Sequence, residues 1–259
     1  MAFWDEEVPD ILGQSVSVLE GQGHHPRFDA IVVDEAQDFR EMWWYSISED
    51  LMVDDSGSSL QVFLDPNQSL WGEVNRPEIG LPEALKVETN CRNTKLVAEF
   101  SSNVLDLEAK TFRFAPEGVP ATITSARNQD EQKRLVTSRV QRLLTNQKLP
   151  PNQLVLIGPA TKDKGSLASV DTIAGVKLIT SASEWRRGGG ILVTTARAFK
   201  GLEASAVIVY DVGVYGPLFT QADLYVASTR ATYSLEVIVH DDEMRSLLRM
   251  ATSRQPAGA

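Results

Sequence analysis

Six short apolar runs, rich in β-branched residues and bounded by turn-forming residues, recur along the chain. Continuous apolar runs of this length are typical of strands in a parallel sheet that is buried on both faces. The six runs are Ala30 to Val33, Leu60 to Leu64, Leu154 to Ile157, Ile191 to Thr194, Ala206 to Tyr210 and Leu235 to Val239.

Helical stretches lie between these runs, and the clearest is Asp130 to Thr145, where Leu and Val recur close to helical spacing. Strands that alternate with helices predict an α/β fold with parallel sheets covered by helices. Such sheets bind ligands at the carboxyl ends of their strands, so functional residues are expected there. A break in the pattern near Pro77 to Lys86 predicts a boundary between two lobes.

Charge and cysteine content limit the possible functions. The formal net charge of -10 argues against a protein that holds nucleic acid by bulk charge, so single-stranded DNA should bind only weakly to the chain alone. The single cysteine, Cys91, excludes an intramolecular disulfide framework and a cysteine-rich zinc site. The acidic N-terminus and the lack of a long apolar run favour a cytoplasmic protein that does not cross a membrane.

The string FDAIVVDEAQDF, residues 28–39, carries the sharpest chemical signal. It places Asp34 and Glu35 at the carboxyl end of a predicted strand. Adjacent carboxylates repel each other, so they usually serve a cation or a proton transfer. In phosphoryl-transfer enzymes one such acid binds Mg²⁺ and another residue orients or deprotonates water. The alternative is an acidic turn after a core strand.

This string resembles motif II of the superfamily 1 (UvrD/Rep-type) DNA helicases, and later segments resemble motifs III to VI in the order of that family. Within the family the resemblance is closest to the compact helicases fused to nuclease-related domains. The later segments are VFLDPNQSLWG (62–72), VETNCRNT (87–94), ILVTTARAFKGLEASAVIVYDV (191–212) and LYVASTRATYSLEVIV (224–239).

The resemblance implies RecA-like lobes that bind ATP and Mg²⁺, and it implies a role for eight residues. Guanidinium groups suit the γ-phosphate contact because they meet phosphate oxygens with a planar fork. The implied roles are Mg²⁺ binding for Asp34, water activation for Glu35, γ-phosphate contacts for Gln68, Arg92 and Arg230, nucleotide contacts for Gly201 and Glu203, with Glu203 near the ribose, and DNA contact for Trp71.

Three positions depart from the family pattern. Cys91 stands where a tyrosine usually stacks on adenine, Arg197 replaces a common histidine, and Glu73 replaces a second aromatic residue after Trp71. A P-loop, GxxxxGK followed by Ser or Thr, is also missing from this chain. The nearest imitation, residues 158–166, has Asp163 at the second glycine position, and an aspartate would repel phosphate.

The sequence therefore predicts a partial first RecA-like lobe (residues 1–86, without a P-loop), a complete second lobe (87–245) and a tail (246–259). The predicted function is part of an ATP-dependent DNA helicase or translocase motor, and autonomous ATP hydrolysis is not expected. Two alternatives remain open. One is a non-catalytic module that binds a protein partner or DNA, and the other is a half-motor completed by a separate P-loop chain.

Overall fold

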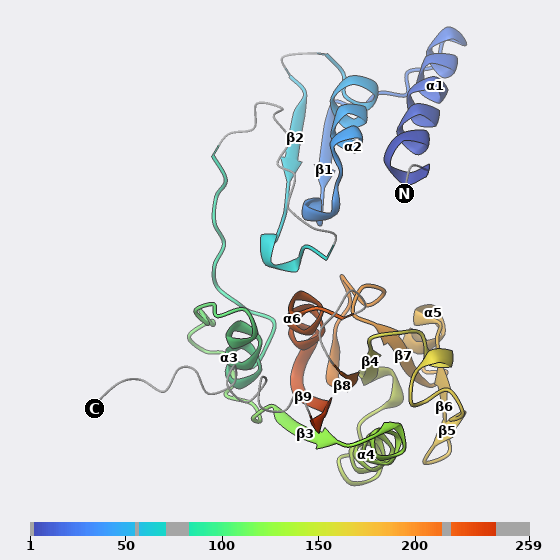
Figure 1. Cartoon of the computed structure of the whole chain (residues 1–259). Helices are drawn as coiled ribbons and strands as arrows, with labels where there is room; N and C mark the ends of the chain where they lie inside the picture. The colour runs from blue at the N-terminus through green and yellow to red at the C-terminus, as the bar shows by residue number, and fades with distance from the viewer. Residues whose placement is uncertain (1–2, 55–56, 71–82, 214–218, 242–259) are drawn as a thin grey trace. The chain divides into compact units, whose positions relative to one another are not determined.

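The computed structural model describes residues 3–54, 57–70, 83–213 and 219–241. The chain divides into two compact units, Met1–Lys86 (unit 1) and Val87–Ala259 (unit 2) (Figure 1). Each unit is described by itself. Among the described residues, no helix combines the length and the apolar character needed to cross a lipid bilayer.

Unit 1 is built around two parallel strands, which pair from Ala30 opposite Ser59 to Val33 opposite Val62. Its elements are a π-helical turn (Phe3–Glu7), α1 (Val8–Gly21), β1 (Ala30–Val33), a 3-10 turn (Ala36–Asp38), α2 (Glu41–Tyr45), a π-helical turn (Ser46–Leu51), β2 (Ser59–Val62) and a 3-10 turn (Pro66–Gln68).

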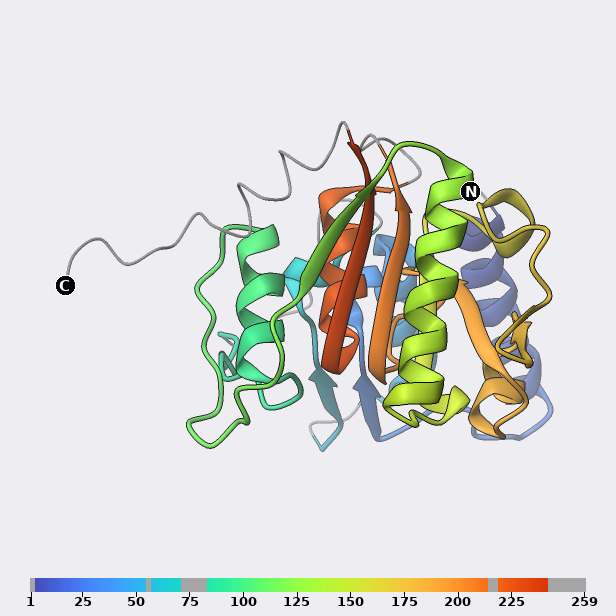
Figure 2. The same cartoon turned by 90° about the horizontal axis from the view of Figure 1, so that it is seen from below.

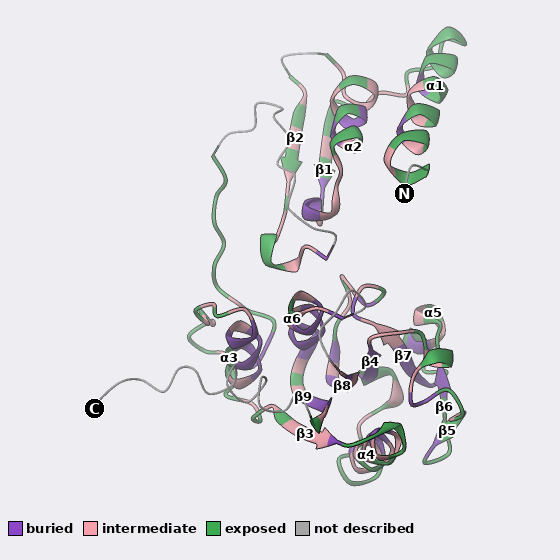
Figure 3. Ribbon diagram, viewed as in Figure 1, coloured by how far each residue is buried: buried purple, intermediate pink, exposed green. Residues whose placement is uncertain are grey.

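Only one face of the β1–β2 sheet is covered by described residues. On that face Val33 packs with Trp44 and Ile47 in a small apolar core. On the other face Val32 is 64% exposed, and Phe63, just after β2, is 56% exposed. The prediction that these strands are buried on both faces is therefore wrong for unit 1, because the described residues cover one face and leave Val32 and Phe63 exposed on the other. Figure 3 shows exposed and intermediate residues along β1 and β2.

Unit 2 contains a seven-stranded sheet in the order β3-β9-β8-β4-β7-β6-β5. All neighbouring strands run parallel except the short β5, which is antiparallel to β6. The main elements are α3 (Lys95–Val104), β3 (Thr122–Ala126), α4 (Gln129–Gln141) continued by a π-helical turn (Arg142–Asn146), β4 (Leu154–Gly158), β5 (Thr172–Ile173), β6 (Val176–Ile179), α5 (Ala182–Arg186), β7 (Ile191–Thr195), β8 (Ala204–Val212), α6 (Gln221–Thr229) and β9 (Ala231–His240). Short 3-10 turns at Pro151–Gln153 and Lys162–Lys164 complete the described elements.

Helices cover both faces of this sheet. α4 packs on one face, against β8, β9 and β3, while α3 and α6 pack together on the opposite face (Figure 2). The central strand β4 is completely buried from Leu154 to Gly158. Unit 2 thus confirms the predicted α/β class with a mostly parallel, helix-covered sheet, an arrangement that is consistent with a RecA-like fold.

Candidate functional site

In unit 1 the paired acids follow directly after β1. Asp34 is exposed and accepts a hydrogen bond at Oδ1 from the backbone N–H of Glu35, at 2.9 Å. Glu35 itself has a φ of 54°, in the left-handed region that residues other than glycine rarely adopt. Such backbone strain costs about 1–3 kcal/mol and is concentrated at functional sites. The sharp turn at Glu35 holds its carboxylate beside the end of the strand.

A buried glutamine connects Glu35 to the second strand. The Gln37 side chain, 2% exposed, donates from Nε2 to Glu35 Oε2 at 2.5 Å. Its Oε1 accepts the backbone N–H of Asp65, just beyond β2, at 2.9 Å. Because an amide side chain donates and accepts at once, Gln37 fixes the Glu35 carboxylate relative to the β2 loop.

The predicted sensor Gln68 joins the same chain of hydrogen bonds. Asp65 caps the short 3-10 turn by accepting the N–H of Asn67 at Oδ1, and its Oδ2 accepts Gln68 Nε2 at 2.7 Å. A continuous series of side chains therefore runs from Glu35 through Gln37 and Asp65 to Gln68. We call these four residues the unit 1 relay. The structure thus links Glu35 to Gln68 through Gln37 and Asp65.

The acidic end of β1 fits a single carboxylate ligand for Mg²⁺. Mg²⁺ is commonly bound through one or two protein carboxylates, while phosphate oxygens and waters supply the rest. Asp34 offers an exposed carboxylate, of which only Oδ1 has a hydrogen bond among the described residues. The described parts of the chain contain no cluster of three or more His, Cys, Asp or Glu side chains that could hold a metal ion.

In unit 2, two asparagines build the turn that carries Arg92. Asn90 Oδ1 accepts the backbone N–H groups of Arg92 and Asn93, at 2.9 and 3.1 Å, and so stabilises the tight turn. The buried Asn93 side chain donates from Nδ2 to the carbonyls of Thr229 and Ala231, at 3.0 and 2.6 Å. These two bonds fix the Arg92 turn to the junction of α6 and β9.

Arg92 lies beside a second predicted nucleotide residue. Its Nε is 3.0 Å from Glu203 Oε2, and both side chains are about half exposed. Gly201, two residues earlier, has a φ of 75°, which a glycine adopts without strain and which turns the chain into β8. An exposed ion pair contributes only about 0–1 kcal/mol, so a more highly charged anion can displace Glu203 from Arg92.

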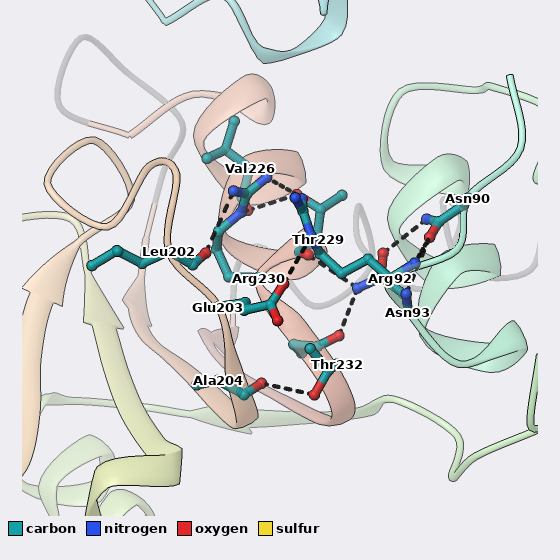
Figure 4. A network of polar contacts seen from close by, with 11 residues as sticks. Asn90, Arg92, Asn93, Leu202, Glu203, Ala204, Val226, Thr229, Arg230 and Thr232 are labelled. Atoms are coloured by element: carbon teal, nitrogen blue, oxygen red, sulfur yellow. Dashed lines mark hydrogen bonds and ion pairs between the residues drawn. The ribbon is translucent and has the colours of Figure 1, made fainter. Parts of the chain in front are cut away.

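Arg230 lies next to this pair but is buried, with 1% of its surface exposed. It follows the last residue of α6, where helix carbonyls lack partners within the helix. Its guanidinium donates to the carbonyls of Val226, at 3.2 Å, and Leu202, at 3.5 Å, and to Thr229 Oγ1. Figure 4 shows Arg92, Glu203 and Arg230 gathered in one polar network.

The position of this network corrects one expectation. Functional residues were expected at the carboxyl ends of the strands, and Asp34, Glu35 and Gln68 do follow β1 and β2. In unit 2, however, Glu203 directly precedes β8 and Arg230 directly precedes β9, at the amino ends of those strands. The reason is local, because the end of α6 and the Gly201 turn place these side chains at the end of the sheet where β8 and β9 begin.

Sequence reasoning missed three positioning residues: Gln37, Asp65 and Asn93. Gln37 lies inside the DEAQD string and Asn93 inside NCRNT, so their motifs were the available signal. Each of the three, however, also bonds to a residue far away in the sequence, 28 positions for Gln37 with Asp65 and 136 and 138 positions for Asn93. Trp71, the predicted DNA contact, lies outside the described residues. The two groups of site residues belong to different units, and each is described only within its own unit.

No family model and no curated protein matches this chain. Among solved structures, the chain is similar to the C-terminal domain of a possible DNA helicase from Lactobacillus plantarum WCFS1, with 18% sequence identity and a TM-score of 0.46. The similarity covers 58% of this chain and 87% of that one. A likeness of this size identifies no family, so the function is argued from the site itself.

Proposed function

We propose that this chain is part of an ATP-dependent DNA helicase or translocase motor. Unit 1 would supply the acids that bind Mg²⁺ and activate water, and unit 2 would supply the arginines that contact the γ-phosphate. The observation that carries the proposal is the unit 1 relay, because it joins the predicted water-activating Glu35 to the predicted sensor Gln68 through partly buried, directional hydrogen bonds.

The relay suits nucleotide hydrolysis for a physical reason. The Glu35 carboxylate accepts a proton from the attacking water, while Gln37 holds that carboxylate in place. Gln68 is tied to the same network through Asp65, so a change at the phosphate contact alters the position of Glu35. Asp34 would hold Mg²⁺, which neutralises phosphate charge when it is bound.

The unit 2 network suits the other half of the reaction. Negative charge on the departing phosphoryl group is spread over several oxygens, and guanidinium groups stabilise it strongly in a site that excludes water. Arg92 is available for this task because its Glu203 partner is exposed. Arg230 is held by the carbonyl oxygens of Val226 in α6 and of Leu202 before β8, so it would act only after its hydrogen bonds rearrange.

The sequence contains no P-loop, so the phosphate cradle in this proposal comes from another segment or another chain. One observation favours a partner that packs on unit 1. The exposed face of the β1–β2 sheet displays Val32 and Phe63, whereas parallel sheets are normally covered on both faces. The half-motor completed by a separate P-loop chain is therefore the favoured alternative. The non-catalytic helicase-like module is the other.

The test is ATP hydrolysis by a reconstituted motor, which is this chain with a P-loop segment fused before residue 1 or added as a separate chain. The chain alone should hydrolyse no measurable ATP. In the reconstituted motor, Glu35→Gln, Arg92→Ala and Arg230→Ala should each lower turnover by about a thousandfold, because each removes transition-state stabilisation.

The matched control is Arg127→Ala, because the Arg127 side chain is 77% exposed and pairs with Glu131 on the surface of unit 2. Turnover in this variant should equal that of the unmodified motor. If all four variants hydrolyse ATP at the same rate, the added segment performs the chemistry alone, and the non-catalytic function is correct.

A further inference from the structure

A tight turn in the connection between α3 and β3 displays two aromatic rings to solvent. The N–H of Ala115 donates to the carbonyl of Phe112 at 2.9 Å and closes the turn. Phe112 is 44% exposed and Phe114 is 70% exposed, and Arg113 between them is also exposed. Neither phenylalanine contributes to the core of unit 2, so packing does not explain their presence.

The turn is fixed at both ends to the segment that contains Arg92. Before the turn, Asn90 donates its N–H to the carbonyl of Lys110 at 2.7 Å, and Phe112 donates its own to the carbonyl of Asn90 at 3.0 Å. After the turn, the N–H groups of Lys95 and Leu96, in the first turn of α3, donate to the carbonyls of residues 116 and 117, at 3.0 and 3.1 Å.

Close packing at Gly118 strengthens the second attachment. Gly118 has a φ of 79°, and a Cβ built there would lie 2.3 Å from Thr94 Oγ1. Only glycine allows the backbone to approach Thr94 so closely. The aromatic turn is therefore a preorganised feature of unit 2, whose backbone is bonded directly to Asn90, the residue that also accepts the N–H of Arg92.

The exposed groups have the chemistry of a base-binding surface. The two rings are 5.5 Å apart at an interplanar angle of 75°, and the Arg113 guanidinium lies 4.3 Å from the centre of the Phe114 ring. Proteins bind bases by stacking them on aromatic rings and on arginine planes, with positive charge nearby for the phosphates. A purely apolar protein partner would not require the exposed cation between the two rings.

We propose that the turn Phe112–Ala115 binds a nucleobase, either of a single strand or of a mononucleotide. The position beside Asn90 and Arg92 links this surface to the γ-phosphate contact, and in that respect the inference rests on the proposed function.

Equilibrium binding to the whole chain tests the proposal at low salt and without hydrolysis. One arm compares a labelled oligothymidylate with an abasic strand of the same length, by fluorescence anisotropy. The other arm compares ATP with inorganic triphosphate, by calorimetry. In each arm the ratio of the two affinities isolates the contribution of the base from that of the phosphates.

The test variant replaces both Phe112 and Phe114 by leucine, which keeps apolar surface but removes the rings. Loss of one stacked base typically weakens binding about tenfold, so the preference for the base-bearing ligand should fall by that factor or more in one arm. The arm in which it falls identifies the source of the base. The control is Tyr233→Leu, which removes another half-exposed ring, on β9.

Two results would overturn the proposal: an unmodified chain with no preference for the base in either arm, or a preference that survives in the double leucine variant. The proposed function can fail separately. A reconstituted motor that never hydrolyses ATP, together with a base preference that depends on Phe112 and Phe114, would refute the motor and leave this binding surface intact.

Discussion

The two units of this chain build their sheets in opposite ways. In unit 2 the central strands are enclosed between helices, and Leu156 on β4 is fully buried. In unit 1 the two-stranded sheet is covered on one face by described residues, and Val32 on β1 is 64% exposed. Unit 2 therefore contains the apolar contacts that a stable fold needs, whereas unit 1 keeps an apolar surface suited to covering by another segment or chain.

The site residues differ in the same way. Unit 1 positions Glu35 through backbone strain and a buried amide at the carboxyl ends of its strands. Unit 2 positions Arg92 and Arg230 at the amino ends of its strands, through side-chain hydrogen bonds to carbonyl oxygens of Ala231, the first residue of β9, and of Val226 in α6. Parallel sheets can thus carry functional groups at the carboxyl or at the amino ends of their strands. The choice depends on where a turn or a helix terminus provides backbone groups without partners.

The largest effect is expected in the core of unit 2. Leu156→Ala removes a fully buried side chain from the main apolar cluster and should lower the free energy of unfolding by about 2–5 kcal/mol. Hydrogen exchange of the β4 amides measures this loss for unit 2 alone. The matched variant Val32→Ala should change the free energy of opening, measured by hydrogen exchange of the β1 amides, by less than about 0.5 kcal/mol. Equal losses would show that the β1–β2 sheet is covered on both faces.

A smaller effect is expected in the unit 1 relay. Gln37→Leu keeps the volume of the side chain but removes the acceptor of the Asp65 N–H and the hydrogen bond that Gln37 donates to the Glu35 carboxylate. An unsatisfied buried group costs about 1–3 kcal/mol, and the loss should appear in amide exchange of β1 and β2. The exchange of unit 2 serves as the internal control. Unchanged protection in unit 1 would show that the relay does not hold the two strand ends together.

The smallest effect concerns pH. Burial raises the pKa of the Asp211 carboxyl above its usual range, although the Ser166 amide and His240 oppose this shift. The folded state therefore binds a proton on the Asp211 carboxyl more tightly than the unfolded chain does, in which an aspartate has a pKa of about 3.9. The stabilisation is complete below that pH and is lost as the pH rises through the raised pKa of the folded state. The stability of the wild type relative to Asp211→Asn should fall as the pH rises from about 3.

Asp163 provides a control of opposite sign. A hydrogen bond from the Thr161 side chain lowers the pKa of this exposed carboxyl. Its contribution to stability is present above the unfolded pKa and is lost as the pH falls through the folded pKa. The stability of the wild type relative to Asp163→Asn should therefore change in the opposite direction over the acidic range. Denaturant unfolding at several pH values measures the stability of the wild type relative to each variant. If both stability differences change with pH in the same direction, the pKa of Asp211 is not raised in the folded state.

Much of the fold was predictable because buried parallel strands leave an unambiguous apolar pattern. Five of the six predicted runs lie within or coincide with strands, the run from Leu60 overlaps β2, and the helix predicted from Asp130 is α4. β3, β5 and β6 were missed, because Thr122–Ala126 is polar, β5 is only two residues long and Lys177 interrupts the short β6. The exposed face of unit 1 could not be predicted, because apolar residues look alike in sequence whether or not another element covers them.

The site was only partly predictable. Each motif indicated which residue types matter, and within each unit the structure brings the described candidates close together. Local sequence could not reveal the partners, since Asn93 bonds to carbonyls 136 and 138 positions away. The burial of Arg230 was equally hidden. It depends on how α6 ends against the Gly201 turn, which a motif does not encode.

The most direct test of the central claim is a double-mutant cycle between the two units, measured as single-turnover ATP hydrolysis by the reconstituted motor. Arg92→Ala is chosen over Arg230→Ala because Arg92 is half exposed and its loss should leave the fold intact. If the proposed function is correct, Glu35→Gln and Arg92→Ala should each lower the rate about a thousandfold. The rate of the double variant should then lie within about tenfold of the rate of the slower single variant, because the effects of residues that act as a unit are not additive. Losses that multiply, or single variants that keep the full rate, would contradict the account.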